Sequence, residues 1–397
     1  MKETTFRGKN QDRALLNQAD FIRLIYSGAM FILSRRLGLP PALPKLEECP
    51  QLPLSALAGP DQAELHKLVE NFFGLAGESP PKASDKIGQY AERLHRRWSS
   101  GSRAIIFHTS GSTGEPKAAP HSEEMLQQEM KALAGFFIQP RRIVAAVPLL
   151  HSYGFVFGVL LAKALGLEAI DVPPLPTVIS ASLKPDDLLV GFPLLFSRWP
   201  GSPPAGVQAL SATAPLEEHL FADLKKMVFF SLNEIYGTSE TGAIAFRGGP
   251  GPFRLLHYWW KAGPDHLKRL MPKGTGLMYP LPDYASWQDE RSFIPAGRKD
   301  LAVQVGGVNV YPGRVAALIE DHPLVDSCLV RPMRAEEGER LKAFIVPARE
   351  DDETKIRRDL AVRFKELSPP ERPGSLSFGP RLPQSETGKV GDWKIKS

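Results

Sequence analysis

A stretch rich in hydroxyl and glycine residues between Phe107 and Ser122 has the composition of an anion-binding loop. It reads FHTSGSTGEPKAAPHS and places Lys117 shortly after the last glycine. Glycine lets backbone N–H groups approach an anion closely, hydroxyl groups donate to phosphate oxygens, and the lysine adds positive charge. The residues that form the pattern are Thr109, Ser110, Gly111, Ser112, Thr113 and Gly114. The stretch therefore predicts a phosphate-binding loop.

Two other interpretations of this loop fit less well. A Walker A loop requires G-x-x-x-x-G-K-[ST], whereas here Pro116 precedes the lysine and two residues separate Gly111 from Gly114. A flexible polar linker is disfavoured because the apolar residues before the loop read as a strand and residues 122–137 have helical periodicity, with Ser122 as the N-cap. The predicted order is strand, loop, helix.

The loop resembles the phosphate loop T-S-G-[ST]-T-G-x-P-K-G of the acyl-adenylate-forming enzymes, a superfamily of acyl- and aryl-CoA ligases, adenylation domains of peptide synthetases and luciferases. Ala118 stands where the family has a glycine after the lysine. Further family motifs follow in order from about Arg103 to the C-terminus, whereas residues 1–102 show no match. The chain therefore resembles a compact, N-terminally shortened member of this superfamily.

The segment EIYGTSETG resembles the family motif Y-G-x-[ST]-E. An aromatic ring such as that of Tyr236 stacks on adenine, and Gly237 leaves space for the base. Ser239, next to Thr238, can donate to the α-phosphate, and Glu240 can hold Mg²⁺, which prefers carboxylate and phosphate oxygens. A surface hairpin turn is the alternative interpretation.

Two more segments resemble the family's acyl and adenine motifs. In PLLHSYG the resemblance places His151 beside the acyl pocket, although a lone histidine in an apolar run is more often a hydrogen-bonded core residue. In LSATAPLEEHL it places Thr213, Ala214 and Pro215 along the adenine, with Ala212 and Thr213 in place of two glycines. A helix that begins at Pro215 fits the same letters.

The segment AGRKDLAVQVGGVNVYP resembles the family's hinge region. The resemblance implies that Arg298 contacts the ribose and that Asp300 is the pivot between two domains. It also implies that Gly306 and Gly307 line the tunnel for a pantetheine thiol. Arg314 stands where the family commonly has glutamate, which puts the local packing or thiol contacts in question.

Two single residues complete the implied site. The family has a ribose-binding aspartate upstream of the hinge arginine, and Asp283 lies at the expected offset, although Pro282 replaces a glycine. Near the C-terminus, LPQSETGKVGDW resembles P-x-[ST]-x-x-G-K, whose lysine enters the active site from the small domain. Lys389 then bridges the reacting carboxylate and the α-phosphate. Taken alone, this segment reads as a mobile C-terminal tail.

The resemblance implies ATP-dependent activation of a fatty or aromatic carboxylic acid to an acyl-adenylate, with release of pyrophosphate. The acyl group then passes to the thiol of CoA or of a carrier protein's phosphopantetheine. Catalysis of this kind rests on alignment and charge neutralisation, here by Lys389, Lys117, the hydroxyl loop and Mg²⁺ on Glu240. The alternative is a nucleotide- or ligand-binding protein with little turnover, since several motif positions have drifted.

These residues require a scaffold in which strands alternate with helices. Apolar runs such as RIVAAVPLL and EAIDVP alternate with helical ones such as LEEHLFADLKKMV, so the fold class is predicted to be α/β. We expect a large domain over residues 1–299, with sheets flanked by helices and a helical segment over 1–102. A small, mobile α+β domain is expected over 300–397. It should contain the strands LAVQVGG, VDSCLVRP and LKAFIVPA and two helices.

Composition limits the partners. Lys and Arg total 49 against 44 Asp and Glu, a net charge of +5 without a basic stripe, which argues against nucleic-acid binding and suits an acidic carrier protein. Two distant cysteines indicate neither a disulfide framework nor a zinc site, so a cytoplasmic location is expected. The apolar run FIRLIYSGAMFIL is too short to span a bilayer and reads as a packed helix.

Overall fold

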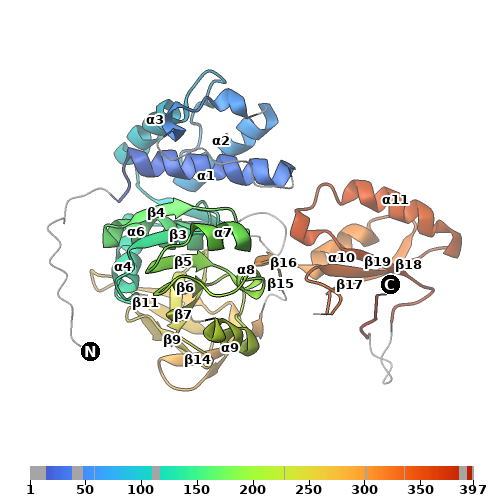
Figure 1. Ribbon diagram of the computed structural model, residues 1–397. Coiled ribbons are helices and arrows are strands. Elements are labelled where there is room, and N and C mark those ends of the chain that lie inside the picture. Colours follow the sequence, from blue (N-terminus) through green and yellow to red (C-terminus); the bar gives the residue numbers. More distant parts are fainter. Residues whose placement is uncertain are drawn as a thin grey trace.

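The computed structural model describes residues 15–37, 48–57, 59–109, 117–227, 229–299, 302–334, 336–383 and 391–395. Figure 1 shows a large lobe, residues 15–299, and a small lobe, residues 302–395, drawn in orange and red at one side. Within the described ranges, none of the helices is both long enough and apolar enough to cross a membrane.

The large lobe is built on a mixed sheet of β3 (Arg142–Ala145), β4 (Glu168–Asp171), β5 (Asp187–Gly191), β6 (Gln208–Ser211), β7 (Ser231–Thr238), β8 (Gly242–Arg247), β9 (Phe253–Leu255), β13 (Asp283–Trp287) and β14 (Ser292–Arg298). Their order in the sheet is β13-β14-β9-β8-β7-β6-β5-β3-β4. The pairs from β4 to β7 are parallel. The pairs from β7 to β13 are antiparallel. This arrangement confirms the predicted α/β class.

The parallel strands β3, β5 and β6 are buried on both faces, as such sheets require. Alternate residues face opposite cores: Leu188 and Val190 join one hydrophobic cluster, whereas Leu189 joins another. The first cluster is covered by α4 (Glu123–Leu133), α5 (Ser152–Gly154) and α6 (Leu161–Leu165). The second is covered by α7 (Pro176–Ser182), α8 (Pro193–Ser197) and α9 (Glu218–Lys226). A smaller antiparallel sheet of β10 (Trp259–Lys261), β11 (His266–Leu270) and β12 (Gly276–Pro280) completes the lobe.

The N-terminal helices belong to the large lobe. They are α1 (Gln18–Leu37), α2 (Gly59–Phe73) and α3 (Ile87–Ser100), shown in blue above the sheet in Figure 1. Their buried residues share one hydrophobic cluster with the sheet. Arg23 of α1 is buried and donates from Nε to Asp171 of β4 at 2.9 Å and from Nη1 to the Gly158 carbonyl at 2.8 Å. The arginine that interrupts the apolar run therefore ties α1 to the sheet edge.

The small lobe has the predicted α+β composition. It contains β15 (Val303–Val305), β16 (Val308–Val310), α10 (Pro312–Glu320), β17 (Val325–Pro332), β18 (Leu341–Pro347), α11 (Glu353–Arg363) and β19 (Ser375–Phe378). Its core is a separate hydrophobic cluster of small-lobe residues. The expected single strand LAVQVGG is instead one arm of the β15–β16 hairpin, turned at Gly306 and Gly307, which both have positive φ.

The expected order of strand, loop and helix around the phosphate loop is incomplete. After β1 (Ile105–Thr109) the chain forms a second strand, β2 (Lys117–His121), which pairs antiparallel with the first so that Thr109 lies opposite Lys117. Helix α4 then begins as predicted, with Ser122 Oγ accepting from the Met125 amide at 3.2 Å. The described residues on either side of the predicted loop, Thr109 and Lys117, are thus partners in one antiparallel pair of strands.

Candidate functional site

The predicted residues gather where the parallel strands end. Ser211 closes β6 beside Gly191, the end of β5, and the chain then turns through Thr213. Strand β7 continues past its pairing with β6 and ends on the Tyr236–Thr238 segment. In sheets with parallel strands, ligands bind outside the carboxyl ends of the strands. The geometry thus places the Thr213 and Tyr236 segments at the expected edge.

Tyr236, Asp283 and Arg298 meet although they come from three different strands. The Tyr236 hydroxyl donates a short hydrogen bond to Asp283 Oδ2, and Arg298 Nε lies 3.9 Å from Asp283 Oδ1. Asp283 is buried and pairs with Arg298 across β13 and β14. Burial and the neighbouring Asp283 raise the pKa of Tyr236, so its hydroxyl stays protonated and donates. Aromatic stacking, a carboxylate and a guanidinium are therefore available within one small region.

Behind this group, aromatic packing holds the Tyr236 ring. Its centroid lies 5.2 Å from that of Phe293 in an edge-on contact and 5.6 Å from that of Phe253. Gly237, the next residue, has no room for a side chain because a Cβ would come within 2.3 Å of the Gly242 carbonyl oxygen. The close approach of β8 therefore requires the glycine in this motif.

Thr213 has a strained backbone and touches the small lobe. Its φ is 76°, a region that β-branched residues rarely adopt. A Cβ built on Gly307, in the β15–β16 turn, would lie 2.8 Å from Thr213 Oγ1. Figure 1 shows β15 and β16 at the junction of the two lobes. Two residues that were predicted separately, one for adenine and one for the thiol tunnel, are thus neighbours.

Glu234 and Arg247 position the Ala214–Leu216 turn, and the sequence did not single them out. Buried Glu234 accepts from the Leu216 amide at 2.9 Å and from Arg247 Nε at 2.7 Å. Arg247 also donates to the Leu216 carbonyl at 3.0 Å. The Leu216 amide is therefore tied to β7, and Pro215 precedes α9 rather than beginning it.

The turn that carries Ser239 and Glu240 is held from behind. Thr241 Oγ1 accepts from the Thr238 amide at 3.1 Å, and fully buried His121 lies with Nε2 2.7 Å from the Ser239 carbonyl. Burial lowers the pKa of His121 to about 4, so it is neutral at pH 7. The Glu240 side chain itself is exposed. The turn is thus rigid at its base and presents a carboxylate to solvent.

A second buried network supports the same turn. Glu129 of α4 accepts from the Ala243 amide at 2.8 Å, and Arg269 of β11 donates to the Thr241 carbonyl at 3.1 Å and to the Met125 carbonyl at 2.7 Å. Glu129 Oε2 is buried without a hydrogen-bond partner, and burial raises the pKa of Glu129 to about 7. Sequence patterns did not reveal these residues because charged side chains on helices and strands usually face solvent.

His151 lies immediately before α5, and this helix packs against the backbone of the loop that precedes His151. A Cβ on Gly154 would lie 2.1 Å from the Pro148 carbonyl oxygen, so the PLLHSYG motif needs glycine there for backbone contact. The His151 side chain has substantial solvent exposure, yet desolvation lowers its pKa. The phenylalanines that follow, Phe155 and Phe157, are core residues.

Several predicted residues lie outside the described part of the chain. They are Ser110, Gly111, Ser112, Thr113, Gly114, Asp300 and Lys389. Thr109 is described only through its backbone pairing with Lys117, whose side chain is exposed. Among the departures from the family, Arg314 donates to Glu371 at 2.8 Å and so packs within the small lobe.

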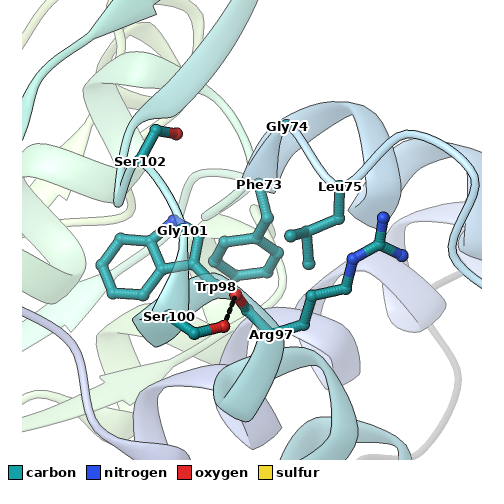
Figure 2. Close-up of a pocket in the computed structure, with 8 residues that line it drawn as sticks. All are labelled: Phe73, Gly74, Leu75, Arg97, Trp98, Ser100, Gly101 and Ser102. Atoms are coloured by element: carbon teal, nitrogen blue, oxygen red, sulfur yellow. Dashed lines mark hydrogen bonds between the residues drawn. The ribbon is translucent and has the colours of Figure 1, made fainter.

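A pocket of about 300 Å³ lies away from this site, on the N-terminal helices. Figure 2 shows Phe73 and Trp98 side by side in it, with Arg97 and Ser100 at its wall. Ser100 Oγ donates back to the Arg97 carbonyl at 2.9 Å, and Arg97 Nη1 pairs with Glu78 at 2.6 Å. The Arg97 and Ser100 side chains are thus engaged within the helical segment, and we assign no ligand to this pocket.

Comparison with known proteins gives matches over most of the chain. The model of the AMP-binding enzyme family matches residues 27–261, and the match therefore begins within α1. The chain is 37% identical over 343 residues to a 4-coumarate–CoA ligase of Halorhodospira halophila, covering 83% of this chain and 86% of the relative. It is 34% identical over 318 residues to a 4-coumarate–CoA ligase of Rhodobacter capsulatus, covering 78% and 80%.

A solved structure shares the fold. It is a malonyl-CoA ligase in complex with methylmalonyl-CoA and AMP, with a TM-score of 0.57 and 20% identity. The similarity covers 70% of this chain and 71% of that chain.

Proposed function

The chain belongs to the family of AMP-binding enzymes, and from this membership we propose that it is a ligase joining an aromatic acid of the 4-coumarate type to CoA with cleavage of ATP to AMP and pyrophosphate. Two relatives named 4-coumarate–CoA ligase match 83% and 78% of this chain, and the matches extend over 86% and 80% of the relatives themselves. The contact of Tyr236 with Asp283, beside Arg298, is the observation on which the site assignment rests.

The proposed nucleotide site uses these three residues together. The Tyr236 ring, packed on Phe293, offers a face for adenine, while Asp283 and Arg298 bind the ribose hydroxyls. Thr213, Ala214 and Pro215 border the base, and Glu234 holds the following residue, Leu216, in place. Gly237, Thr238 and Ser239 lie along the α-phosphate.

The proposed chemistry has two steps. A carboxylate is a poor acyl donor, so its oxygen first attacks the α-phosphorus of ATP, forming an acyl-adenylate and releasing pyrophosphate. Lys389 is assigned to the charge that develops between the carboxylate and the α-phosphate, and Lys117 with Thr109, Ser110, Gly111, Ser112, Thr113 and Gly114 to the departing phosphates. In the second step the CoA sulfur attacks the acyl carbon, and AMP leaves. His151 is assigned to the acyl pocket.

Magnesium is included in this proposal. Mg²⁺ commonly binds through one or two carboxylates and the substrate's phosphates, and it keeps several waters. The exposed Glu240 side chain, on a turn held from behind by His121, fits that donor set. Bound there, the ion would neutralise phosphate charge and orient the leaving group.

The two steps are proposed to need different positions of the small lobe. The β15–β16 turn, with Gly306 and Gly307, touches Thr213 in the structure, which suits the thiol-transfer step. Asp300 is the proposed pivot, and rotation about it would bring Lys389 to the site for adenylate formation.

The test measures 4-coumarate-dependent release of pyrophosphate from ATP and Mg²⁺, followed by thioester formation with CoA. We expect both products, and Lys389→Ala should reduce pyrophosphate release by about 100-fold or more while nucleotide binding persists. Nucleotide binding without acyl-adenylate across a panel of aromatic and fatty acids would instead support a binding protein. Adenylate formation without CoA thioester, but with transfer to a phosphopantetheinylated carrier protein, would replace CoA as the acceptor.

A further inference from the structure

A cluster of ion pairs around a buried lysine in the small lobe holds the last described residues of the chain. Lys342 of β18 is 0% exposed. Its ammonium donates to Glu337 Oε2 and to the Trp393 carbonyl oxygen, each at 2.6 Å, and lies 3.1 Å from Asp392 Oδ1. One buried cation thus contacts both a loop of the lobe and the C-terminal segment.

A second cation and further hydrogen bonds complete the cluster. Arg334 Nε donates to Asp392 Oδ2 at 2.7 Å, and the Ile395 amide donates to Glu337 Oε1 at 3.1 Å. Hydrogen bonds from the Arg334 amide and from Lys342 lower the pKa of Glu337 to about 2. The two carboxylates are therefore matched by two cations, and the buried Lys342 ammonium has the charged partners that its burial requires.

Aromatic packing anchors the same segment. Trp393 is 8% exposed, its ring centroid lies 4.9 Å from Lys342 Nζ and 5.5 Å from that of Phe344, and its Nε1 donates to Ser377 Oγ at 3.1 Å. The Gly391 amide also donates to the Pro383 carbonyl at 2.8 Å, which joins the C-terminal segment to the residues that follow β19. Residues 391–393 are thereby fastened at several points.

The cluster lies next in sequence to the lysine assigned to adenylate formation. Only Val390 separates Lys389 from Gly391. Because consecutive Cα atoms are about 3.8 Å apart, the Lys389 Cα lies within about 7.6 Å of the Gly391 Cα whatever the local conformation. Ion pairs around a buried cation add little net stability compared with apolar packing, so the value of this cluster lies in specifying one position of the segment.

We propose that Lys342, through Glu337, Asp392 and Trp393, is a positioning residue for Lys389: the cluster fixes the base of the segment from which the catalytic lysine reaches the α-phosphate. The inference rests on the proposed function. It predicts that the cluster matters for adenylate formation and not for thioester formation, since Lys389 acts in the first step alone.

The experiment separates the two half-reactions in the full-length chain. Adenylate formation is followed by pyrophosphate release with ATP, Mg²⁺ and 4-coumarate, and thioester formation by reaction of presynthesised 4-coumaroyl-adenylate with CoA. Lys342→Met keeps most of the side-chain volume and removes the charge. We expect it to slow the first rate by about 10- to 100-fold through misplacement of the lysine and to leave the second within about twofold. Asp392→Asn, which keeps Lys342 paired with Glu337, should give the same selectivity with a smaller loss.

The matched control is Glu371→Gln, which breaks the Arg314–Glu371 ion pair in the same lobe without touching residues 391–395. It should change neither half-reaction selectively. A parallel fall of both rates in the Lys342 and Asp392 variants, or no fall in either, would overturn the proposal. If Lys389→Ala itself left pyrophosphate release intact, the site assignment under the proposed function would fail instead, and the two failures are therefore distinguishable.

Discussion

Gly307 of the small lobe lies directly against Thr213 of the large lobe, so closely that a Cβ on the glycine would stand 2.8 Å from the threonine Oγ1. Both residues have positive φ, 81° and 76°. The contact joins the turn assigned to the thiol tunnel with the turn assigned to adenine. It is the feature from which the behaviour of the two half-reactions can best be tested.

Gly307→Ala should impair thioester formation more than adenylate formation, because the added methyl group would push the β15–β16 turn away from Thr213. The matched control is Gly306→Ala, since Gly306 also has positive φ but a Cβ added to it would meet nothing within 4 Å. Rates of CoA transfer from presynthesised acyl-adenylate in the two variants give the comparison. Equal rates in the two variants would mean that backbone strain, and not the contact, is responsible.

Tyr236→Phe should raise the KM for ATP by about tenfold, because it removes a hydrogen bond to a charged carboxylate while keeping the ring. Tyr236→Leu should raise it further by removing the stacking face. Tyr284→Phe removes a hydroxyl from an exposed tyrosine next to Asp283 and serves as the control. Initial rates at varied ATP measure the effect, and an unchanged KM in Tyr236→Leu would contradict the assignment of this ring to adenine.

Glu129→Gln should stabilise the protein increasingly as the pH rises. Burial raises the pKa of Glu129 from its ordinary 4.5 to about 7, so the folded state holds a proton that the unfolded state releases, and stability falls between these pH values. The free energy of unfolding of the parent protein should fall by about 3 kcal/mol across this pH range, and the glutamine variant should lack this fall. Urea unfolding at pH 5 and pH 8 measures it. Burial lowers the pKa of His121 to about 4, so this residue makes stability rise with pH, but it contributes equally to the parent and to the variant. A stability difference between parent and variant that is the same at pH 5 and pH 8 would refute the prediction.

Gly154→Ala should destabilise the large lobe by about 3 kcal/mol and lower activity, because the methyl group would meet the Pro148 backbone, which cannot move as a side chain would. Gly135→Ala, in the exposed turn after α4 with nothing within 4 Å, should change stability by less than about 0.5 kcal/mol. Thermal melting of the two variants beside the parent provides the measurement. Similar melting temperatures in both would show that the loop before His151 adapts.

Local signals in the sequence predicted the elements well. Ser122 was identified as an N-cap because its hydroxyl acts within one turn, and the Tyr236 motif could be placed because its residues are adjacent. Strand β2 was missed, since KAAPH contains none of the residues favoured in strands (Val, Ile, Thr, Phe, Tyr or Trp) and gains its stability from pairing with β1.

Long-range relationships at the site could not be predicted from the sequence. The Tyr236–Asp283 hydrogen bond joins residues 47 positions apart, and it depends on the order of strands in the sheet. Glu129 and Arg269 were overlooked because a charged residue read from sequence is assigned to the surface, whereas here both are buried beneath the Ser239–Glu240 turn. Arg314, which stands where the family commonly has glutamate, forms an ion pair with Glu371, and no local sequence pattern indicates this partner.

The separate hydrophobic core of the small lobe has a calorimetric consequence. The helices α1 to α3 share their apolar packing with the nine-stranded sheet, whereas the buried apolar residues described in the small lobe form a cluster of their own. Units that do not share buried surface unfold independently. A heating scan should therefore show two endotherms, the larger containing the melting of the N-terminal helices, and nucleotide analogues should shift that larger peak upward.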